Sequence, residues 1–146
     1  MRRDEYFTRG IKSPQYFYFE IPKEAPSVNH IWLTAGRGGA RRLSQKAIAF
    51  YKLAQGYIFP KRIPDDWQSA VVRICVAPKA RRGDVDNRIK AVLDALTKAL
   101  FWKDDSVVSE VSCVFEEPIG GDGRTRILIT PGGEKFPSFK EVEEDD

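Results

Sequence analysis

Residues 85–100 read VDNRIKAVLDALTKAL and contain the most regular pattern of the chain. Apolar side chains recur at helical spacing, at Val85, Ile89, Val92, Leu93, Leu96 and Leu100. Polar side chains fill the other face, at Asn87, Arg88, Lys90, Asp94 and Lys98. This pattern predicts an amphipathic helix that covers a core, with Asp84 and Asp86 where an N-cap belongs.

Strand-like segments lie on both sides of this helix. Segments rich in β-branched and aromatic residues are found at residues 15–21 (QYFYFEI), 69–77 (SAVVRICVA), 106–115 (SVVSEVSCVF) and 124–130 (RTRILIT). A glycine-rich basic loop at 36–42 precedes a second helical pattern over 44–58. The order predicts an α/β (α+β) fold, a single small domain whose mixed sheet of about four to five strands is covered by two main helices.

The chain length of 146 residues is enough for one globular domain. We expect a loose N-terminal arm over residues 1–14, a folded domain over 15–133 and an acidic, disordered tail over 134–146. No run of about 18 or more apolar residues occurs, and the start of the chain lacks the apolar core of a secretory signal. We therefore expect a cytoplasmic protein with no membrane segment.

Histidine and cysteine are scarce in this sequence. The one histidine, His30, argues against catalytic triads, zinc hydrolases and nucleases that use histidine-bound metals. Any catalytic groups must then be carboxylates or lysine. The two cysteines, Cys75 and Cys113, lie in β-like apolar runs, and we expect both to be core residues rather than zinc ligands.

Charge is unevenly distributed along the chain. Residues 134–146 hold six acidic residues and two lysines, a net charge of −4. The rest of the chain has 22 Lys and Arg against 15 Asp and Glu, a net charge of +7. A basic body with an acidic tail suits a polyanionic partner, although a solvated lysine-rich surface is the commoner meaning of a modest positive charge.

Four acidic residues flank the predicted helix. Asp84 and Asp86 precede it, and Asp104 and Asp105 follow its far end. A helix of this length spans roughly 22 Å, so the acids meet only if the chain turns back beneath the helix or if the helix is shorter than its pattern. Converging carboxylates would form an all-oxygen site for Mg²⁺ or Mn²⁺, which implies phosphodiester hydrolysis. Lys90 would then bind or stabilise the scissile phosphate.

A structural interpretation of the same residues competes with this one. Asp is common in helix caps and turns, and Asp86, Lys90 and Asp94 have the spacing of an ordinary i,i+4 ion-pair stripe. Two features favour a site. Capping needs one Asp rather than two, and an apolar Trp102 beside four acids is an unusual surface. Spacing alone leaves the two interpretations about equal.

The arrangement of these residues resembles the signature of the RusA-type Holliday junction resolvases, endodeoxyribonucleases of bacteria and their prophages. The matching elements are Gly83-Asp84-Val85-Asp86-Asn87, Lys90, Asp94-Ala95-Leu96, Trp102-x-Asp104-Asp105-x-x-Val108 and, upstream, Pro26-Ser27-Val28-Asn29. The likeness runs from about residue 15 to residue 130. The loop at 36–42 and the tail after Gly133 are not part of the pattern.

The resemblance implies a set of roles for these residues. Asp84, Asp86 and Asp105 would bind Mg²⁺. Independently of the resemblance, Mn²⁺ is a candidate substitute in an all-oxygen site, and a bent strand start would make Asp104 a secondary ligand. Lys90 would be required for catalysis. The resemblance also implies a homodimer that acts on four-way DNA junctions, and a two-fold pair of chains suits a junction because two symmetric nicks are needed.

Two basic clusters are candidate DNA contacts. Lys79, Arg81 and Arg82 lead directly into Asp84, where their charge would offset the repulsion of phosphates by the acids. Arg37, Arg41 and Arg42 lie in or beside the glycine-rich loop, with Lys46 nearby, and a solvated loop is nearly as good an interpretation of that cluster. Asn29, in the upstream element, is a further candidate.

The tryptophans and the two adjacent acids allow further expectations. Burial is expected for Trp32, Trp67 and Trp102, with a base or dimer contact as the alternative for Trp102. Strand alternation would place Asp105 on the more apolar face with Val107, Val111, Cys113 and Phe115, and Asp104 toward solvent with Ser106, Val108, Glu110 and Ser112.

These observations predict a Mg²⁺-dependent, structure-selective DNA endonuclease that resolves Holliday junctions by paired symmetric nicks in recombination and repair. Such an enzyme would be associated with the nucleoid when it acts. The alternatives are a flap- or fork-directed nuclease, or a catalytically inactive DNA-binding protein of the same fold.

Overall fold

The computed structural model describes residues 16–28, 31–34, 41–80 and 86–133. The strands are β1 (Phe17–Ile21), β2 (Trp32–Thr34), β3 (Arg41–Leu43), β4 (Ala70–Ala77), β5 (Val108–Phe115) and β6 (Arg124–Pro131). The α-helices are α2 (Gln45–Ile58) and α3 (Ile89–Lys98), and two short 3-10 helices are η2 (Asp86–Arg88) and η3 (Asp105–Val107). No helix in these ranges is long and apolar enough to cross a membrane.

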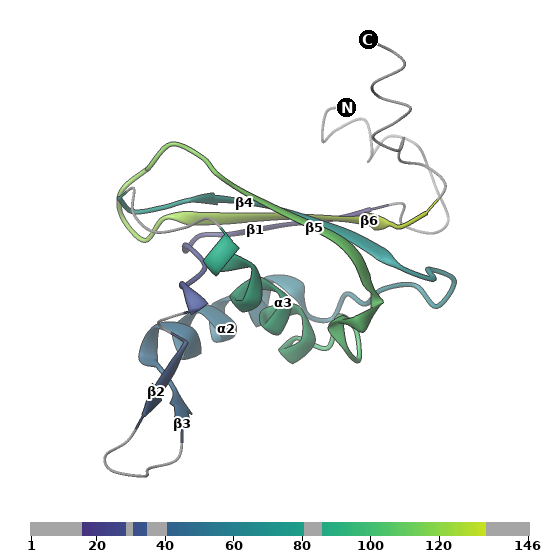
Figure 1. Cartoon of the computed structure of the whole chain (residues 1–146), viewed down its shortest axis with the longest axis horizontal. Coiled ribbons are helices and arrows are strands. Elements are labelled where there is room, and N and C mark those ends of the chain that lie inside the picture. Colours follow the sequence, from purple (N-terminus) through teal and green to yellow (C-terminus); the bar gives the residue numbers. More distant parts are fainter. Residues whose placement is uncertain (1–15, 29–30, 35–40, 81–85, 134–146) are drawn as a thin grey trace.

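The main sheet has four strands in the order β1-β6-β4-β5. Strand β6 is antiparallel to both β1 and β4, whereas β4 and β5 are parallel and are joined by the crossover through α3. Both α-helices cover the same face of this sheet (Figure 1). The predicted single domain with a mixed sheet and two helices is therefore confirmed.

A separate β2–β3 hairpin carries part of the predicted glycine-rich loop. Arg41 and Arg42 belong to strand β3, paired with Thr34 and Leu33, so the prediction of a loop is wrong for these two residues. The hairpin projects from the helical side of the molecule, away from the main sheet (Figure 1). Trp32, at the base of this hairpin, is 41% exposed, which contradicts the expectation that it is buried.

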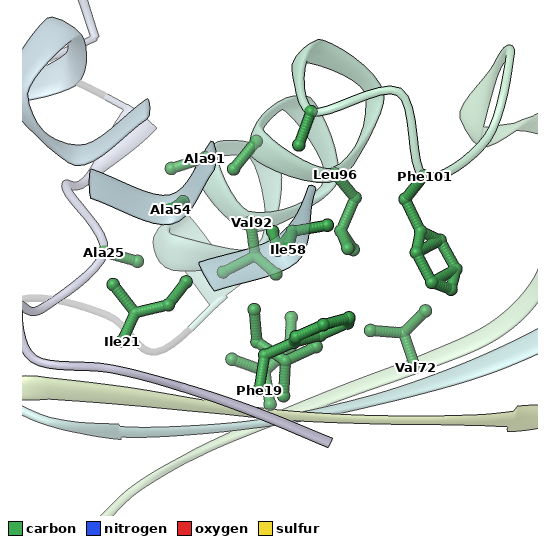
Figure 2. Packing of buried hydrophobic residues seen from close by; sticks show 14 of the residues in the cluster. Phe19, Ile21, Ala25, Ala54, Ile58, Val72, Ala91, Val92, Leu96 and Phe101 are labelled. Atoms are coloured by element: carbon green, nitrogen blue, oxygen red, sulfur yellow. The ribbon is translucent and has the colours of Figure 1, made fainter. Parts of the chain in front are cut away.

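The core lies between the helices and one face of the sheet. Side chains of Phe19 and Ile21 on β1 and Val72 on β4 meet the buried faces of both helices (Figure 2). Phe101, which follows α3, packs edge-on against Phe17 and Phe19. Trp67 partly packs on this core, with its ring edge-on to Phe17.

Helix α2 begins and ends where its sequence predicts. The Ser44 side chain caps it by accepting a hydrogen bond from the Ala47 amide at 3.1 Å. Its buried face consists of Ala47, Phe50, Tyr51, Ala54 and Ile58, as helical spacing requires.

Helix α3 is shorter than its sequence pattern. The chain makes a 3-10 turn over Asp86–Arg88 and becomes α-helical only at Ile89, so its N-cap is Arg88, which makes no side-chain capping bond. The expectation that Asp84 or Asp86 caps the helix is therefore wrong. At the other end Leu100 has φ +62° and is 59% exposed, because the helix has already ended at Lys98.

Strand β5 begins two residues later than predicted. Asp105 lies in η3, so the alternation argument does not apply to Asp104 and Asp105. An irregularity pairs Ala70 with Val108 but Val71 with Glu110. This bulge brings the even-numbered Val108 to the core side together with Cys113 and Phe115.

The two cysteines differ in their surroundings. Both thiols are free, and both residues are half-buried. Cys113 packs against the core, as expected. Cys75 alternates with the buried Ile74 and Val76 along β4, so it lies on the opposite face of the sheet, and its placement in the core is wrong.

Candidate active site

The structure describes part of the predicted metal site. Asp84 and the side chain of Asp86 lie outside the described residues, although the backbone of Asp86 opens η2. Lys90, Asp104 and Asp105 are described completely. Among the side chains that are described, no three His, Cys, Asp or Glu gather closely enough to hold a metal ion.

The two predicted acid pairs flank opposite ends of α3. Arg88, at the start of the helix, lies with its guanidinium 5.7 Å from the ring of Phe115, the last residue of β5. Asp105 opens η3, which directly precedes β5. Strand β5 has eight residues, and at about 3.3 Å per residue its two ends are roughly 23 Å apart. One chain therefore holds Asp86 and Asp105 at opposite ends of the β4–β5 pair.

Asp104 and Asp105 form a tight local pair. The Asp104 side chain caps η3 by accepting a hydrogen bond from the Ser106 amide at 2.8 Å, and this bond lowers the pKa of Asp104, with a smaller contribution from Asp105. Asp104 is exposed and Asp105 is half-buried. Carboxylate oxygens are the donors that Mg²⁺ and Mn²⁺ prefer, so this pair fits one side of such a site chemically.

Lys90 is held by an acidic neighbour on the same helix. Its Nζ lies 3.1 Å from Oδ1 of Asp94, and the Tyr51 hydroxyl donates to Oδ2 of the same carboxylate at 3.4 Å. Burial, and secondarily the Asp94 charge, raises the pKa of Tyr51, so the hydroxyl keeps its proton. The i,i+4 pair anticipated from spacing is thus present, and Lys90 remains more than half exposed. Nothing in the sequence indicated that Tyr51 contacts Asp94, because helical periodicity identifies Tyr51 only as an apolar position of its helix.

Trp102 does not form an apolar surface beside the acids. It is 3% exposed, its indole nitrogen donates to Oγ1 of Thr97 at 2.9 Å, and its ring packs edge-on against Phe101. The expectation of burial is confirmed. The argument that an exposed Trp102 favours a functional site is wrong, because the chain turns inward after α3.

The predicted DNA-contact residues are only partly described. Lys79 is exposed just beyond β4, and Arg42 is exposed on β3. The remaining candidates lie outside the described residues, in whole or in their side chains: Asn29, Arg37, Arg41, Arg81 and Arg82.

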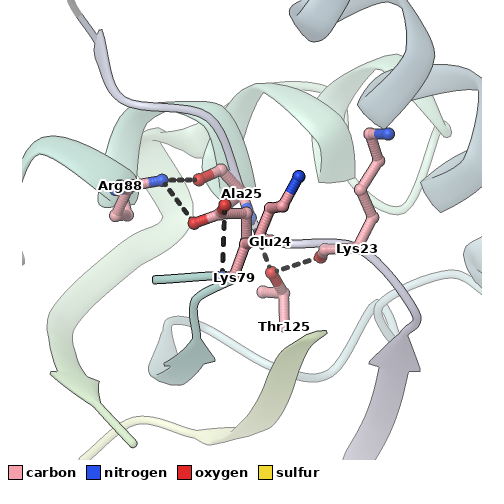
Figure 3. A network of polar contacts seen from close by, with 6 residues as sticks. All are labelled: Lys23, Glu24, Ala25, Lys79, Arg88 and Thr125. Carbon is pink, nitrogen blue, oxygen red and sulfur yellow. Dashed lines mark hydrogen bonds and ion pairs between the residues drawn. The ribbon is translucent and has the colours of Figure 1, made fainter. Parts of the chain in front are cut away.

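Arg88 and Glu24 are polar residues of this region that the sequence did not single out. The sequence pattern assigned Arg88 to the polar face of the helix, but it is only 7% exposed. Its Nη1 bonds the carboxylate of Glu24 at 3.2 Å and the carbonyl of Ala25 at 2.6 Å (Figure 3). Helical periodicity carried no signal for this contact, because the two partners are 64 positions apart.

An α+β domain with a crossover helix between parallel strands, acids before and after that helix and a lysine on it is the scaffold of a candidate nuclease. Comparison with known proteins identifies the family within that class. Residues 7–130 match the family Endodeoxyribonuclease RusA, and the chain belongs to this family.

The similar curated proteins share a shorter segment with this chain. The crossover junction endodeoxyribonucleases RusA of Escherichia coli (strain K12) and of Enterobacteria phage 82 are each 46% identical over 59 residues, which is 40% of this chain and 48% of theirs. The protein of that name from Escherichia coli O139:H28 is 41% identical over 61 residues, 42% of this chain and 50% of its own. The chain thus spans about half the length of the curated relatives it matches.

Proposed function

We propose that this protein is a Mg²⁺-dependent, structure-selective DNA endonuclease that resolves four-way junctions by paired symmetric nicks. The observation that carries the proposal is the family match over residues 7–130, a range that includes every acid and lysine of the predicted site. The names of the similar proteins, crossover junction endodeoxyribonucleases, point to the same substrate class.

The metal ligands in this proposal are Asp84, Asp86 and Asp105, with Asp104 as a candidate secondary ligand. A bound Mg²⁺ or Mn²⁺ lowers the pKa of an attacking water and neutralises charge on the leaving oxygen. Asp104 already accepts a bond from the Ser106 amide, so its first task is to hold the η3 turn that carries Asp105.

Lys90 is the proposed phosphate-binding cation. Lys90 lies in the first turn of α3, and its ion pair with Asp94 restrains its long side chain. A lysine side chain that is already restrained loses less conformational entropy on binding a phosphate oxygen than an unrestrained lysine does. Asp94 and Tyr51 act through Lys90 and are positioning residues in this scheme.

The placement of the acids gives a structural reason for the proposed homodimer. Within one chain, Asp86 and Asp105 flank opposite ends of α3, so one chain offers two separate acidic ends. In a dimer whose two-fold axis passes between these ends, each end of one chain would lie beside the opposite end of the other. Two complete sites would then face the two strands that a junction resolvase must cut.

DNA contacts are proposed for the basic residues nearest the acidic segment. Lys79, Arg81 and Arg82 precede Asp84 directly and would attract the phosphates that the carboxylates repel. Arg37, Arg41 and Arg42, in the glycine-rich basic sequence at 36–42, and Asn29 are the second group.

A cleavage assay tests the function. The purified protein is incubated with labelled four-way junction, flap, fork and linear duplex, each with Mg²⁺ and with EDTA. Symmetric nicks in the junction, lost with EDTA, are the expected result. Preferential cutting of flaps or forks would favour the alternative nuclease, and junction binding without cleavage would identify an inactive DNA-binding protein.

Lys90→Ala is expected to slow junction cleavage by about 100-fold or more, because a cation that stabilises the transition state is lost. An exposed i,i+4 pair contributes only about 0.3–0.5 kcal/mol, so the melting temperature should barely change. Lys52→Ala, which removes an exposed lysine of α2, is the control and should cut normally. Normal cleavage by Lys90→Ala would contradict the catalytic role and would mean that Lys90 only forms an exposed ion pair with Asp94.

Deleting residues 134–146 is expected to tighten junction binding and to steepen its salt dependence. The six acids of this segment would compete with DNA phosphates for the basic body of the chain. Binding of full-length and truncated protein is compared over a salt series. Equal affinities at low salt would mean that the segment only adds solubility.

A further inference from the structure

Leu100 occupies a backbone conformation that leucine rarely adopts. Its φ is +62°, in the left-handed region, and no other non-glycine residue in the described ranges has a positive φ. The Leu100 amide donates to the Thr97 carbonyl at 3.0 Å, and the Phe101 amide donates to the Leu96 carbonyl at 3.0 Å. These two hydrogen bonds form a Schellman motif at the end of α3. Such a motif usually places glycine, and sometimes asparagine, at this position.

The Leu100 side chain is exposed, although its neighbours are buried. Leu100 is 59% exposed, whereas Ala99 is 1%, Phe101 is 0% and Trp102 is 3% exposed. Phe101 points into the core (Figure 2), and the Trp102 indole is fixed by its hydrogen bond to Thr97. Buried residues on both sides therefore anchor the turn that presents Leu100 to solvent.

Leucine at this position costs stability and gains little packing within the chain. A left-handed conformation is unfavourable for a residue with a Cβ, and a side chain this exposed buries little apolar area. Strained residues of this kind cluster at sites that bind or act on another molecule. The combination of exposure and strain therefore indicates that Leu100 contacts a partner.

The surroundings of Leu100 are basic. The Ile63 amide donates to the Phe101 carbonyl at 2.9 Å, which places the chain after α2 beside the chain after α3. Residues 59–64 and 98–103 together hold four cationic residues and no acidic one, and acidic residues follow at Asp65 and Asp104. The four cationic residues, all exposed, are Lys61, Arg62, Lys98 and Lys103. This charge suits an anionic partner, and DNA is the anionic substrate proposed above.

Large apolar side chains are what DNA-bending proteins insert between base pairs, and leucine is among the residues used in this way. Cations beside the inserted side chain bind the flanking phosphates. Leu100 also lies in the same α3–β5 connection as Asp105, a proposed metal ligand. A base pair in contact with Leu100 would therefore lie on the side of the protein where cleavage is proposed.

We propose that Leu100 is an apolar wedge that covers an unstacked base pair at the branch point of a DNA junction. This inference rests on the proposed function and deepens it, because it names a residue that distinguishes a junction from continuous duplex. Inside a linear duplex every base pair is stacked on both faces, so insertion there costs the full free energy of unstacking. A base pair at an open branch point has one free face, which a rigidly held leucine can cover at a lower cost.

Leu100→Asn is the sharpest variant, because asparagine tolerates the left-handed conformation and is similar in size but polar. The probe is a four-way junction with 2-aminopurine beside the branch point, whose fluorescence rises when this base is unstacked. Wild-type binding in Ca²⁺ should raise the fluorescence, and the variant should give a much smaller rise. Junction affinity should fall by about 5- to 10-fold, near the lower limit for aromatic stacking on one base, while linear-duplex affinity stays unchanged.

Leu100→Met and Val114→Thr are the matched controls. Methionine keeps an apolar side chain of similar volume, so Leu100→Met should unstack the junction like the wild type. Val114 is 53% exposed and pairs with Cys75, so it lies on the face of the sheet away from the helices. Making this similarly exposed residue polar should change neither the fluorescence rise nor the junction affinity.

An unchanged fluorescence rise and junction affinity in folded Leu100→Asn would overturn the proposal, as would a wild-type protein whose binding gives no rise. A variant that sediments as a different oligomer from the wild type would overturn it in favour of a contact between protein chains. If Leu100→Asn does not fold, Leu100→Gly, which the backbone conformation favours, is measured in the same way. The proposed function fails on a different result, a wild-type protein that raises the fluorescence but leaves junction DNA uncut with Mg²⁺.

Discussion

Replacing Asp86 with asparagine is expected to abolish junction cleavage while preserving junction binding. Asparagine keeps the size of the side chain and one oxygen, but it removes the negative charge that a divalent cation needs. Transition-state stabilisation by a bound metal is worth several kcal/mol, and about 4 kcal/mol corresponds to roughly a thousandfold in rate. Asp86 lies in η2 rather than at the helix cap, so the substitution removes no cap from α3.

Two measurements on the same preparation test this expectation. Cleavage of a labelled junction is followed with Mg²⁺, and binding is measured by gel shift in Ca²⁺ or EDTA. Asp94→Asn, which replaces an acid on the same helix, is a useful comparison because it changes the charge beside Lys90 rather than a proposed ligand. Joint loss of binding and cleavage by folded Asp86→Asn would instead assign Asp86 to substrate positioning.

Asp105→Asn is expected to eliminate Mg²⁺-dependent cleavage, whereas Asp104→Asn should leave a reduced but measurable rate. The reason now lies in the η3 turn and not in strand alternation. The Asp104 carboxylate already accepts the Ser106 amide, and an asparagine oxygen can keep that cap. Asp105 is half-buried beside it and is the proposed ligand.

Both variants are compared on one junction substrate at several Mg²⁺ concentrations. Circular dichroism shows whether each protein is folded. If Asp104→Asn is the inactive variant and Asp105→Asn the partly active one, the ligand has been assigned to the wrong residue of the pair.

Local patterns in the sequence predicted most of the secondary structure. Helix α2 and strands β1, β4 and β6 lie within a residue or two of their predicted limits, because period and capping depend on neighbouring residues. The two errors in α3 and β5 both occur at ends. There, the 3-10 turns η2 and η3 replace regular structure, and contacts with distant residues decide where the helix or strand begins.

The sequence by itself determined the order of helices and strands, the buried face of α2, and the candidate residues for binding a metal and a phosphate. Each of these depends on side chains close together in the chain. The parallel pairing of β4 with β5 decided that Asp86 and Asp105 lie at opposite ends of that strand pair. The contact of Arg88 with Glu24 decided what flanks the acidic segment, and it joins residues 64 positions apart. Only tertiary structure settles such contacts, because the free energy of burying and pairing charged groups depends on which distant segments the fold brings together.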